Sequence, residues 1–310
     1  MSSDFNEISA SSYRNLNLGY LMKRGIFMDN IKTLKRLFNN YLNLNKVLVD
    51  QAAIAVVPAR KTGNLPISDL DIEEDYIYYC FTKFTKTMIA IENLLKNELY
   101  EDALILVRSN YECLVNAKSI IKNDKMIDHL IDYKLGLLNQ KKYDFVKSKK
   151  GNNIWGKISP IKDKSIEIAY ISNISQIAEV AEEETSYKYI YSYLCDITHC
   201  NMVTSPYYRE GIQYTYKLAN DLVLFNVLLW SIYFNLKFYN TLIDSEILEI
   251  QELEDSVLDI LISDQIKVLK FFEDEEKRII KELNAISDEE EKIKCREYLV
   301  VLESLKRNAH

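Results

Sequence analysis

Residues 99–122 read Leu-Tyr-Glu-Asp-Ala-Leu-Ile-Leu-Val-Arg-Ser-Asn-Tyr-Glu-Cys-Leu-Val-Asn-Ala-Lys-Ser-Ile-Ile-Lys, and this stretch decides the fold. At about 100° per residue its apolar side chains surround the helix axis, which is typical of a helix that is buried all round. Arg108 and Glu112 stand one turn apart in its middle. Because buried charges need partners, we expect Arg108 to bond to Glu112 or to a residue of the segment 185–201.

The composition favours a globular, helical protein. Of 310 residues, 48% are hydrophobic and 27% are charged, which is the usual balance of a folded domain and argues against disorder. Seven glycines and four prolines leave few turns, so long helices are expected. The predicted fold class is therefore all-α: a multi-helix bundle with a C-terminal helical hairpin.

Apolar periodicity divides the chain into three parts. Residues 1–27 are expected to form an irregular lead, residues 28–242 a helical bundle with the polar constellation, and residues 243–310 an acidic helical hairpin. No strand is expected; the predicted bundle helices cover about 29–57, 72–97, 99–122, 124–147, 163–183, 185–201 and 212–242.

The predicted location is the cytoplasm. The N-terminus is polar and acidic, unlike a signal peptide, and five cysteines without a CxxC pair indicate reduced thiols. The apolar run 222–236 is shorter than the roughly 20 residues of a membrane span, so no membrane association is expected.

Charge is unevenly distributed around a net −7. Residues 118–164 hold 12 lysines against 5 aspartates, and Lys147, Lys149 and Lys150 of this region are candidate phosphate contacts. The alternative is an ordinary solvated face. Residues 243–310 hold 19 acidic against 10 basic side chains along an apolar stripe, which predicts a homodimer through these helices.

A second motif lies at residues 187–201, Tyr-Lys-Tyr-Ile-Tyr-Ser-Tyr-Leu-Cys-Asp-Ile-Thr-His-Cys-Asn. On a helix, Ser192, Cys195 and His199 share one face. Arg108, Glu112 and His199 are the candidate catalytic residues, since histidine can transfer protons and arginine can stabilise a phosphate at which a 2′-hydroxyl attacks. Neighbouring Tyr111, Tyr191 and Asp196 are candidate binding residues. No ligand spacing for a metal appears, so neither metal nor cofactor is expected.

Each of these features also has a structural explanation. Arg108 and Glu112 can form a buried ion pair that fixes helix register. His199 can cap the C-terminus of its helix, and Cys195 can be a small buried side chain rather than a nucleophile.

Arg108-Ser-Asn-Tyr-Glu112, followed by Tyr191-x-x-Leu194-x-x-x-x-His199, resembles a bacterial helical family, domain of unknown function 5677, over about residues 75–240. Cys195 stands where that family often has serine. The family is itself similar to the higher-eukaryote-and-prokaryote nucleotide-binding (HEPN) bundles, many of which are ribonucleases in toxin and phage-defence systems. The resemblance implies a stress or phage-defence effector or sensor acting on RNA or a nucleotide, with metal-independent ribonuclease activity as one form. This chain lacks the Arg-x(4–6)-His motif of those ribonucleases, so a non-enzymatic interaction or scaffold protein is the alternative.

Overall fold

The computed structural model describes most of the chain between residues 27 and 244 and isolated positions beyond it. The described ranges are 27–55, 59–62, 65–67, 71–138, 141–199, 202–210, 212–216 and 219–244, with single positions or short runs between 263 and 306. The chain divides into two compact units, residues 1–45, 86–110 and 185–310 in the first and residues 46–85 and 111–184 in the second.

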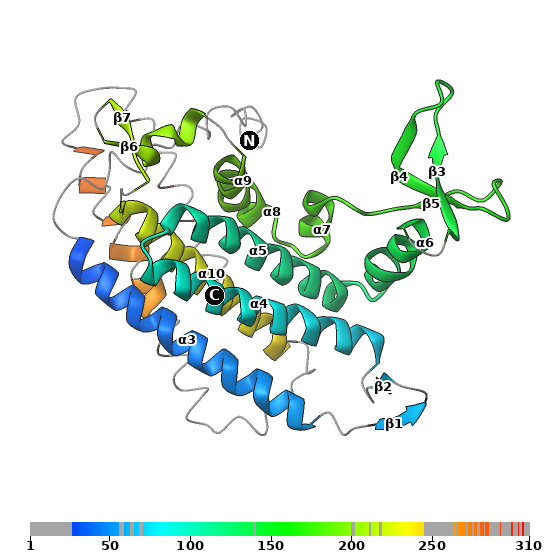
Figure 1. Ribbon diagram of the computed structural model, residues 1–310, viewed down its shortest axis with the longest axis horizontal. Coiled ribbons are helices and arrows are strands. Elements are labelled where there is room, and N and C mark those ends of the chain that lie inside the picture. Colours follow the sequence, from blue (N-terminus) through cyan, green and yellow to red (C-terminus); the bar gives the residue numbers. More distant parts are fainter. Residues whose placement is uncertain are drawn as a thin grey trace, which may run out of the picture. The chain divides into compact units, whose positions relative to one another are not determined.

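Three long helices were predicted close to their observed bounds: α3 (Phe27–Ala55), α4 (Ile72–Lys96) and α5 (Tyr100–Lys122). They are labelled in Figure 1. At the start of α4, Asp71 Oδ1 accepts the Glu74 amide and Glu74 Oε2 accepts the Asp71 amide, a reciprocal capping box. The turn between α4 and α5 has Glu98 in the left-handed region at φ 60°, and Leu99 N–H donates to Leu94 O in a Schellman motif.

The first unit is built on α10 (Asp221–Asp244), which is buried on every side from Val223 to Tyr239. Its packing against α3 includes a buried polar network. Asn45 Nδ2 donates to Asn235 Oδ1 at 2.7 Å, and Tyr239 Oη donates to Asn45 Oδ1. Further along the chain, Phe272 is fully buried with its ring 6.3 Å from that of Tyr233 on α10.

The remaining elements of the first unit lie between residues 184 and 214. A continuous helical segment consists of α8 (Glu184–Ser186), the π-helical η2 (Tyr187–Tyr191) and α9 (Ser192–Thr198). A 3₁₀-helix η3 (Met202–Tyr208) and a two-stranded hairpin, β6 (Arg209–Glu210) and β7 (Gln213–Tyr214), follow.

The second unit combines helices with a three-stranded antiparallel sheet of order β3-β4-β5. After the π-helical η1 (Asp128–Tyr133) and α6 (Lys134–Leu138) come β3 (Tyr143–Lys147), β4 (Asn153–Pro160) and β5 (Ile168–Ala169), then α7 (Ile174–Val180). A further hairpin pairs β1 (Ala59–Thr62) with β2 (Leu65–Ile67).

The expectation of a purely all-α fold is wrong, although the protein is largely helical. The helix expected to reach residue 147 ends at Leu138, and β3 begins at Tyr143. Lys142 N–H donates to Gly136 O, and glycine at position 136 leaves room for the Tyr143 ring, with which a Cβ would clash. Residues 163–173 form turns and β5 instead of helix. The start of the helix expected over 212–242 is also wrong, because β7 precedes α10.

Within the described residues, no helix has both the length and the apolarity to cross a membrane. The expected N-terminal lead, residues 1–27, lies outside the described residues except for its last residue. The expected C-terminal hairpin, residues 243–310, also lies largely outside them, and its homodimer role stays a prediction.

Candidate functional site

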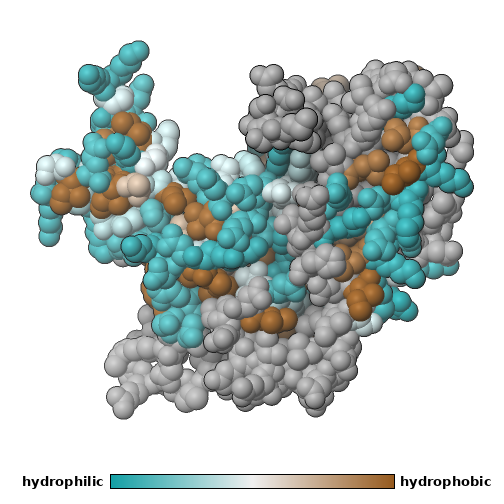
Figure 2. Space-filling view, turned by 180° about the vertical axis from the view of Figure 1, so that it is seen from behind, coloured by the Kyte–Doolittle hydropathy of each residue, from teal (hydrophilic) through white to brown (hydrophobic). Residues whose placement is uncertain are grey.

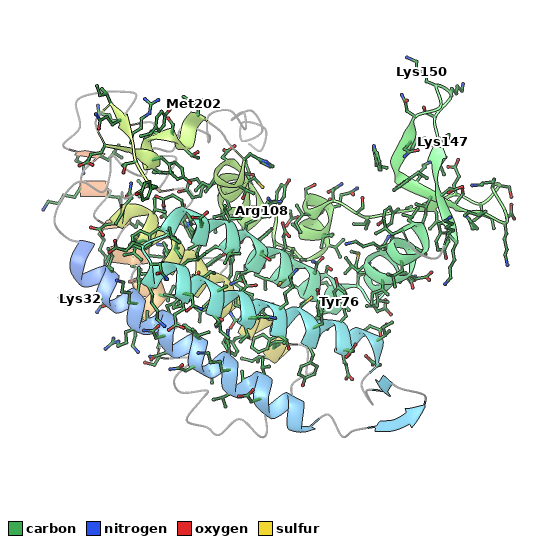
Figure 3. All side chains as sticks on the ribbon, in the orientation of Figure 1. Lys32, Tyr76, Arg108, Lys147, Lys150 and Met202 are labelled. Atoms are coloured by element: carbon green, nitrogen blue, oxygen red, sulfur yellow. The ribbon has the colours of Figure 1, made fainter. Side chains whose placement is uncertain are left out.

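Arg108 is half-buried on α5 and is held by a tyrosine from η2. Its Nε and Nη2 donate to the Tyr191 hydroxyl at 3.2 and 3.0 Å. The guanidinium carbon lies 5.2 Å from the centre of the same ring. Figure 3 labels Arg108 on α5. The expected bond from Arg108 to the segment 185–201 is thus present in the first unit.

Tyr191 is positioned by an unusual stretch of helix. It is only 4% exposed, and its ring stacks on that of Tyr187 with centroids 5.3 Å apart. Both tyrosines belong to η2, where the Ser192 N–H donates to Tyr187 O, one residue further back than in an α-helix. Such π-helical turns are frequent at functional sites because they change the direction in which side chains point.

His199 is exposed at the C-cap of α9. Its backbone is extended, at φ −93° and ψ 140°, and its N–H donates to Cys195 O at 3.1 Å. The capping position considered from the sequence is therefore the one it occupies. Tyr191 and His199 are eight residues apart, about 12 Å along a helix axis. The convergence of Arg108, Glu112 and His199 stays a prediction.

The other predicted site residues differ in burial. Glu112, Asp196 and Cys195 are half-buried. Tyr111 is fully buried, and its hydroxyl donates to the backbone oxygen of Glu183 at 3.2 Å, within the second unit. Its hydroxyl therefore has a structural partner.

The second unit contains a buried ion pair that was not predicted from the sequence. Lys118 Nζ lies 2.5 Å from Glu183 Oε1, and the Glu183 side chain is 1% exposed. A Schellman motif directs Glu183 inward: Glu182 is left-handed at φ 56°, and the Glu183 N–H donates to Ala178 O at 2.7 Å. The next pair, Lys122 with Glu182, is exposed. From the sequence, both glutamates belong to an unremarkable acidic run.

The first unit also holds a buried carboxyl that the sequence did not single out. Glu101 is 6% exposed, and burial raises its pKa. Burial raises the pKa of Tyr193 and of Tyr207, and the negative charge of the Glu101 carboxylate raises both further. The Tyr193 hydroxyl lies 3.4 Å from that of Tyr207 and accepts from Asn226 Nδ2. An acid in the first turn of a helix usually indicates only a favourable dipole interaction, so no sequence signal marked its burial.

In the second unit His129 belongs to an aromatic cluster. Its Nδ1 accepts the Ile171 N–H at 3.1 Å, and burial lowers its pKa against the opposing effect of Asp128. Its ring stacks on Tyr170 and meets Tyr133 edge-on. Accepting a backbone N–H requires a ring nitrogen without a proton, so this bond and burial both favour the neutral form of His129.

Lys147, Lys149 and Lys150 lie at the tip of the β3–β4 hairpin (Figure 3, where Lys147 and Lys150 are labelled). All three are exposed. Lys147 ends β3, where a helix was expected to reach residue 147, and Lys149 and Lys150 lie in the loop that joins β3 to β4.

Within the part of the chain that the structure describes, no three His, Cys, Asp or Glu side chains gather as metal ligands do. Residues 74–210 match the family described as "Family of unknown function (DUF5677)". This confirms the resemblance to that family across both motifs, although the match ends at residue 210 and not near residue 240. No curated protein and no solved structure matches the chain significantly.

Proposed function

We propose that this protein is a bacterial stress or phage-defence effector or sensor that acts on RNA or a nucleotide. In the form we favour, Arg108, Glu112 and His199 cleave a phosphodiester without a metal, as HEPN-type ribonucleases do. The match to a family of unknown function is compatible with this proposal but does not specify an activity.

The observation that carries the proposal is the accessibility of these polar residues. Arg108 and Glu112 lie in the central helix, yet both are half-buried rather than sealed, and His199 is exposed. Two bonds to the Tyr191 hydroxyl help to hold Arg108. They orient the planar guanidinium, whose fork of N–H donors matches the oxygens of a phosphate.

The chemistry follows from these roles. His199 takes the proton of a ribose 2′-hydroxyl, and the 2′-oxygen attacks the adjacent phosphorus. The bond from phosphorus to the 5′-oxygen breaks, which leaves a 2′,3′-cyclic phosphate, and the 5′-oxygen takes up a proton from water while His199 releases its proton to the solvent. Arg108 offsets the charge that develops on the phosphate oxygens. Glu112 and Asp196 are the candidate groups that orient Arg108 and His199.

The alternative is a non-enzymatic helical interaction protein, and one observation favours it. Tyr191 is buried, and its two bonds from Arg108 join α5 to η2. A clamp between helices explains the same contacts without any ligand.

The test is cleavage of single-stranded RNA by the full chain in EDTA. The proposal predicts cleavage that His199→Ala abolishes with little change in melting temperature, while His310→Ala, a histidine at the chain end, retains it. Arg108→Ala should abolish cleavage as well. Activity that EDTA removes would exclude the proposed mechanism. A His199→Ala protein that unfolds would assign that residue to the fold.

A further inference from the structure

We propose that the β3–β4 hairpin binds single-stranded nucleic acid, with Trp155 stacking on a base and Lys147, Lys149 and Lys150 contacting the phosphates beside it. This inference deepens the proposed function by naming the substrate class. It rests on that function only in taking a nucleic acid as the ligand, and the hairpin belongs entirely to the second unit.

Hydrogen bonds of the turn fix the backbone from which the lysines project. Gly151 N–H donates to Ser148 O, and Ser148 N–H donates to Asn152 O, which closes a three-residue loop. Gly151 has φ +81°, a left-handed position that glycine adopts without strain. Lys149 and Lys150 occupy the two preceding loop positions, where both side chains point into solvent. The lysines are thus presented at the far end of a hydrogen-bonded ribbon.

The charge of the hairpin region favours an anionic ligand. Residues 141–164 hold eight lysines and two aspartates, a net charge of +6. Carboxylates near the sheet are already paired: Asp132 with Lys142, Asp144 with Lys164, and Glu167 with Lys157. The three lysines at the tip are not among these pairs, and Lys147 Nζ donates to the neutral amide oxygen of Asn153.

Below the tip an aromatic surface is exposed. Trp155 on β4 is 66% exposed, a high value for the largest apolar side chain. Its indole is not loose, because Phe145 on β3 meets it edge-on with centroids 4.8 Å apart. Phe145 in turn packs against Tyr170, which stacks on His129. In Figure 2, which views the molecule from behind, the projecting hairpin is hydrophilic at its tip and has hydrophobic residues below the tip.

These two features together point to a single strand. Lysines spaced along a backbone bind any polyanion. An ordered, exposed indole, in contrast, buries most of its surface when the flat face of a base stacks on it. Base faces are covered in a duplex and open in a single strand. Stacking tolerates every base, so the hairpin should bind with little sequence preference.

The test uses the full chain and an oligothymidylate of about 12 nucleotides, a length within the range one small binding module covers. This DNA lacks the 2′-hydroxyl, so cleavage cannot interfere with the measurement. We expect binding to quench tryptophan fluorescence. The quench should disappear in Trp155→Phe, because the other tryptophan, Trp230, is buried in α10.

Affinity in matched variants, measured from the fluorescence anisotropy of end-labelled oligothymidylate, separates stacking from charge. Trp155→Ala should weaken binding roughly 5- to 100-fold, with Trp155→Phe intermediate. Leu138→Ala removes another exposed apolar side chain of the second unit and should not weaken binding. Lys149→Glu with Lys150→Glu should weaken binding and lower the salt slope by about 0.7 for each lost contact. Lys125→Glu with Lys134→Glu, which changes the net charge equally, should have a smaller effect on affinity.

A duplex of equal length that binds as tightly as the single strand overturns the proposal. So does an unchanged affinity in a folded Trp155→Ala protein, or an equal loss in the two lysine pairs. Circular dichroism of each variant establishes that it is folded. If oligothymidylate binds as described but RNA is never cleaved, the ribonuclease proposal fails and the hairpin proposal stands.

Discussion

Removal of the Tyr191 hydroxyl tests whether Arg108 is positioned as the structure shows. Tyr191→Phe keeps the buried ring and its 5.3 Å stack on Tyr187 but removes the acceptor for Nε and Nη2 of Arg108. A hydrogen bond to a charged group contributes about 1.5–3 kcal/mol. Because Arg108 is half-buried and water can replace part of the lost bond, we expect about 1–2 kcal/mol of destabilisation.

Urea denaturation followed by circular dichroism measures this loss. Tyr187→Phe is the matched control, since it removes a hydroxyl from the other ring of the stack, and it should change stability little. In a double-mutant cycle with Arg108→Met, the coupling between positions 108 and 191 should be about 1 kcal/mol or more. Equal stability of Tyr191→Phe and wild type, or a coupling near zero, would refute the assignment of this contact.

Three further predictions concern the buried ion pair, the buried carboxyl of Glu101 and the predicted dimer. Glu183→Ala should destabilise by about 3–5 kcal/mol because it leaves Lys118 without its buried partner, whereas Glu182→Ala should have little effect; equal melting temperatures would contradict this. Burial raises the pKa of Glu101, so ionisation of this carboxyl opposes folding. The wild-type protein should therefore lose stability relative to Glu101→Gln as the pH rises through this pKa. A stability difference between the two proteins that does not vary with pH would contradict this prediction. Ile266 is 59% exposed on the apolar stripe of the predicted dimer, so the Ile266→Glu protein should be a monomer by light scattering. A monomeric wild-type protein would contradict the predicted dimer.

The sequence predicted the long helices well because their apolar pattern leaves few other solutions. A helix that is apolar on all sides must be buried, and α5 covers Tyr100–Lys122 where 99–122 was expected. The same reasoning about charge in an apolar helix anticipated a partner for Arg108 from the segment 185–201. It did not identify Tyr191 as that partner, because the π-helical turn that directs the ring depends on one shifted hydrogen bond.

The sheet was missed because its first strand, β3, is short and has lysines on both sides of its aromatic residues. Tyr143 and Phe145 alternate as a strand should, but Lys141, Lys142 and Lys147 around them also suit the outer face of a helix. The pairing of β3 with β4 depends on the left-handed turn at Gly151, a single residue that gives only a weak signal.

The burial of Glu101 and Glu183 likewise could not be predicted from the apolar pattern of the sequence. Glu101 and Glu183 stand at the end or edge of helices, where acidic residues are usually solvated. They are 6% and 1% exposed because side chains distant in the sequence cover them. A rule that reads local spacing cannot locate such contacts.

The most direct test of the proposed function is the chemistry of the RNA ends. Single-stranded RNA and a DNA of the same sequence are incubated with the full chain in EDTA, and the products are identified by mass spectrometry. Attack by the 2′-hydroxyl with His199 and Arg108 predicts RNA fragments that end in a 2′,3′-cyclic phosphate, an intact DNA, and no products from His199→Ala. Uncut RNA, or fragments with a 3′-hydroxyl and a 5′-phosphate, would contradict the account.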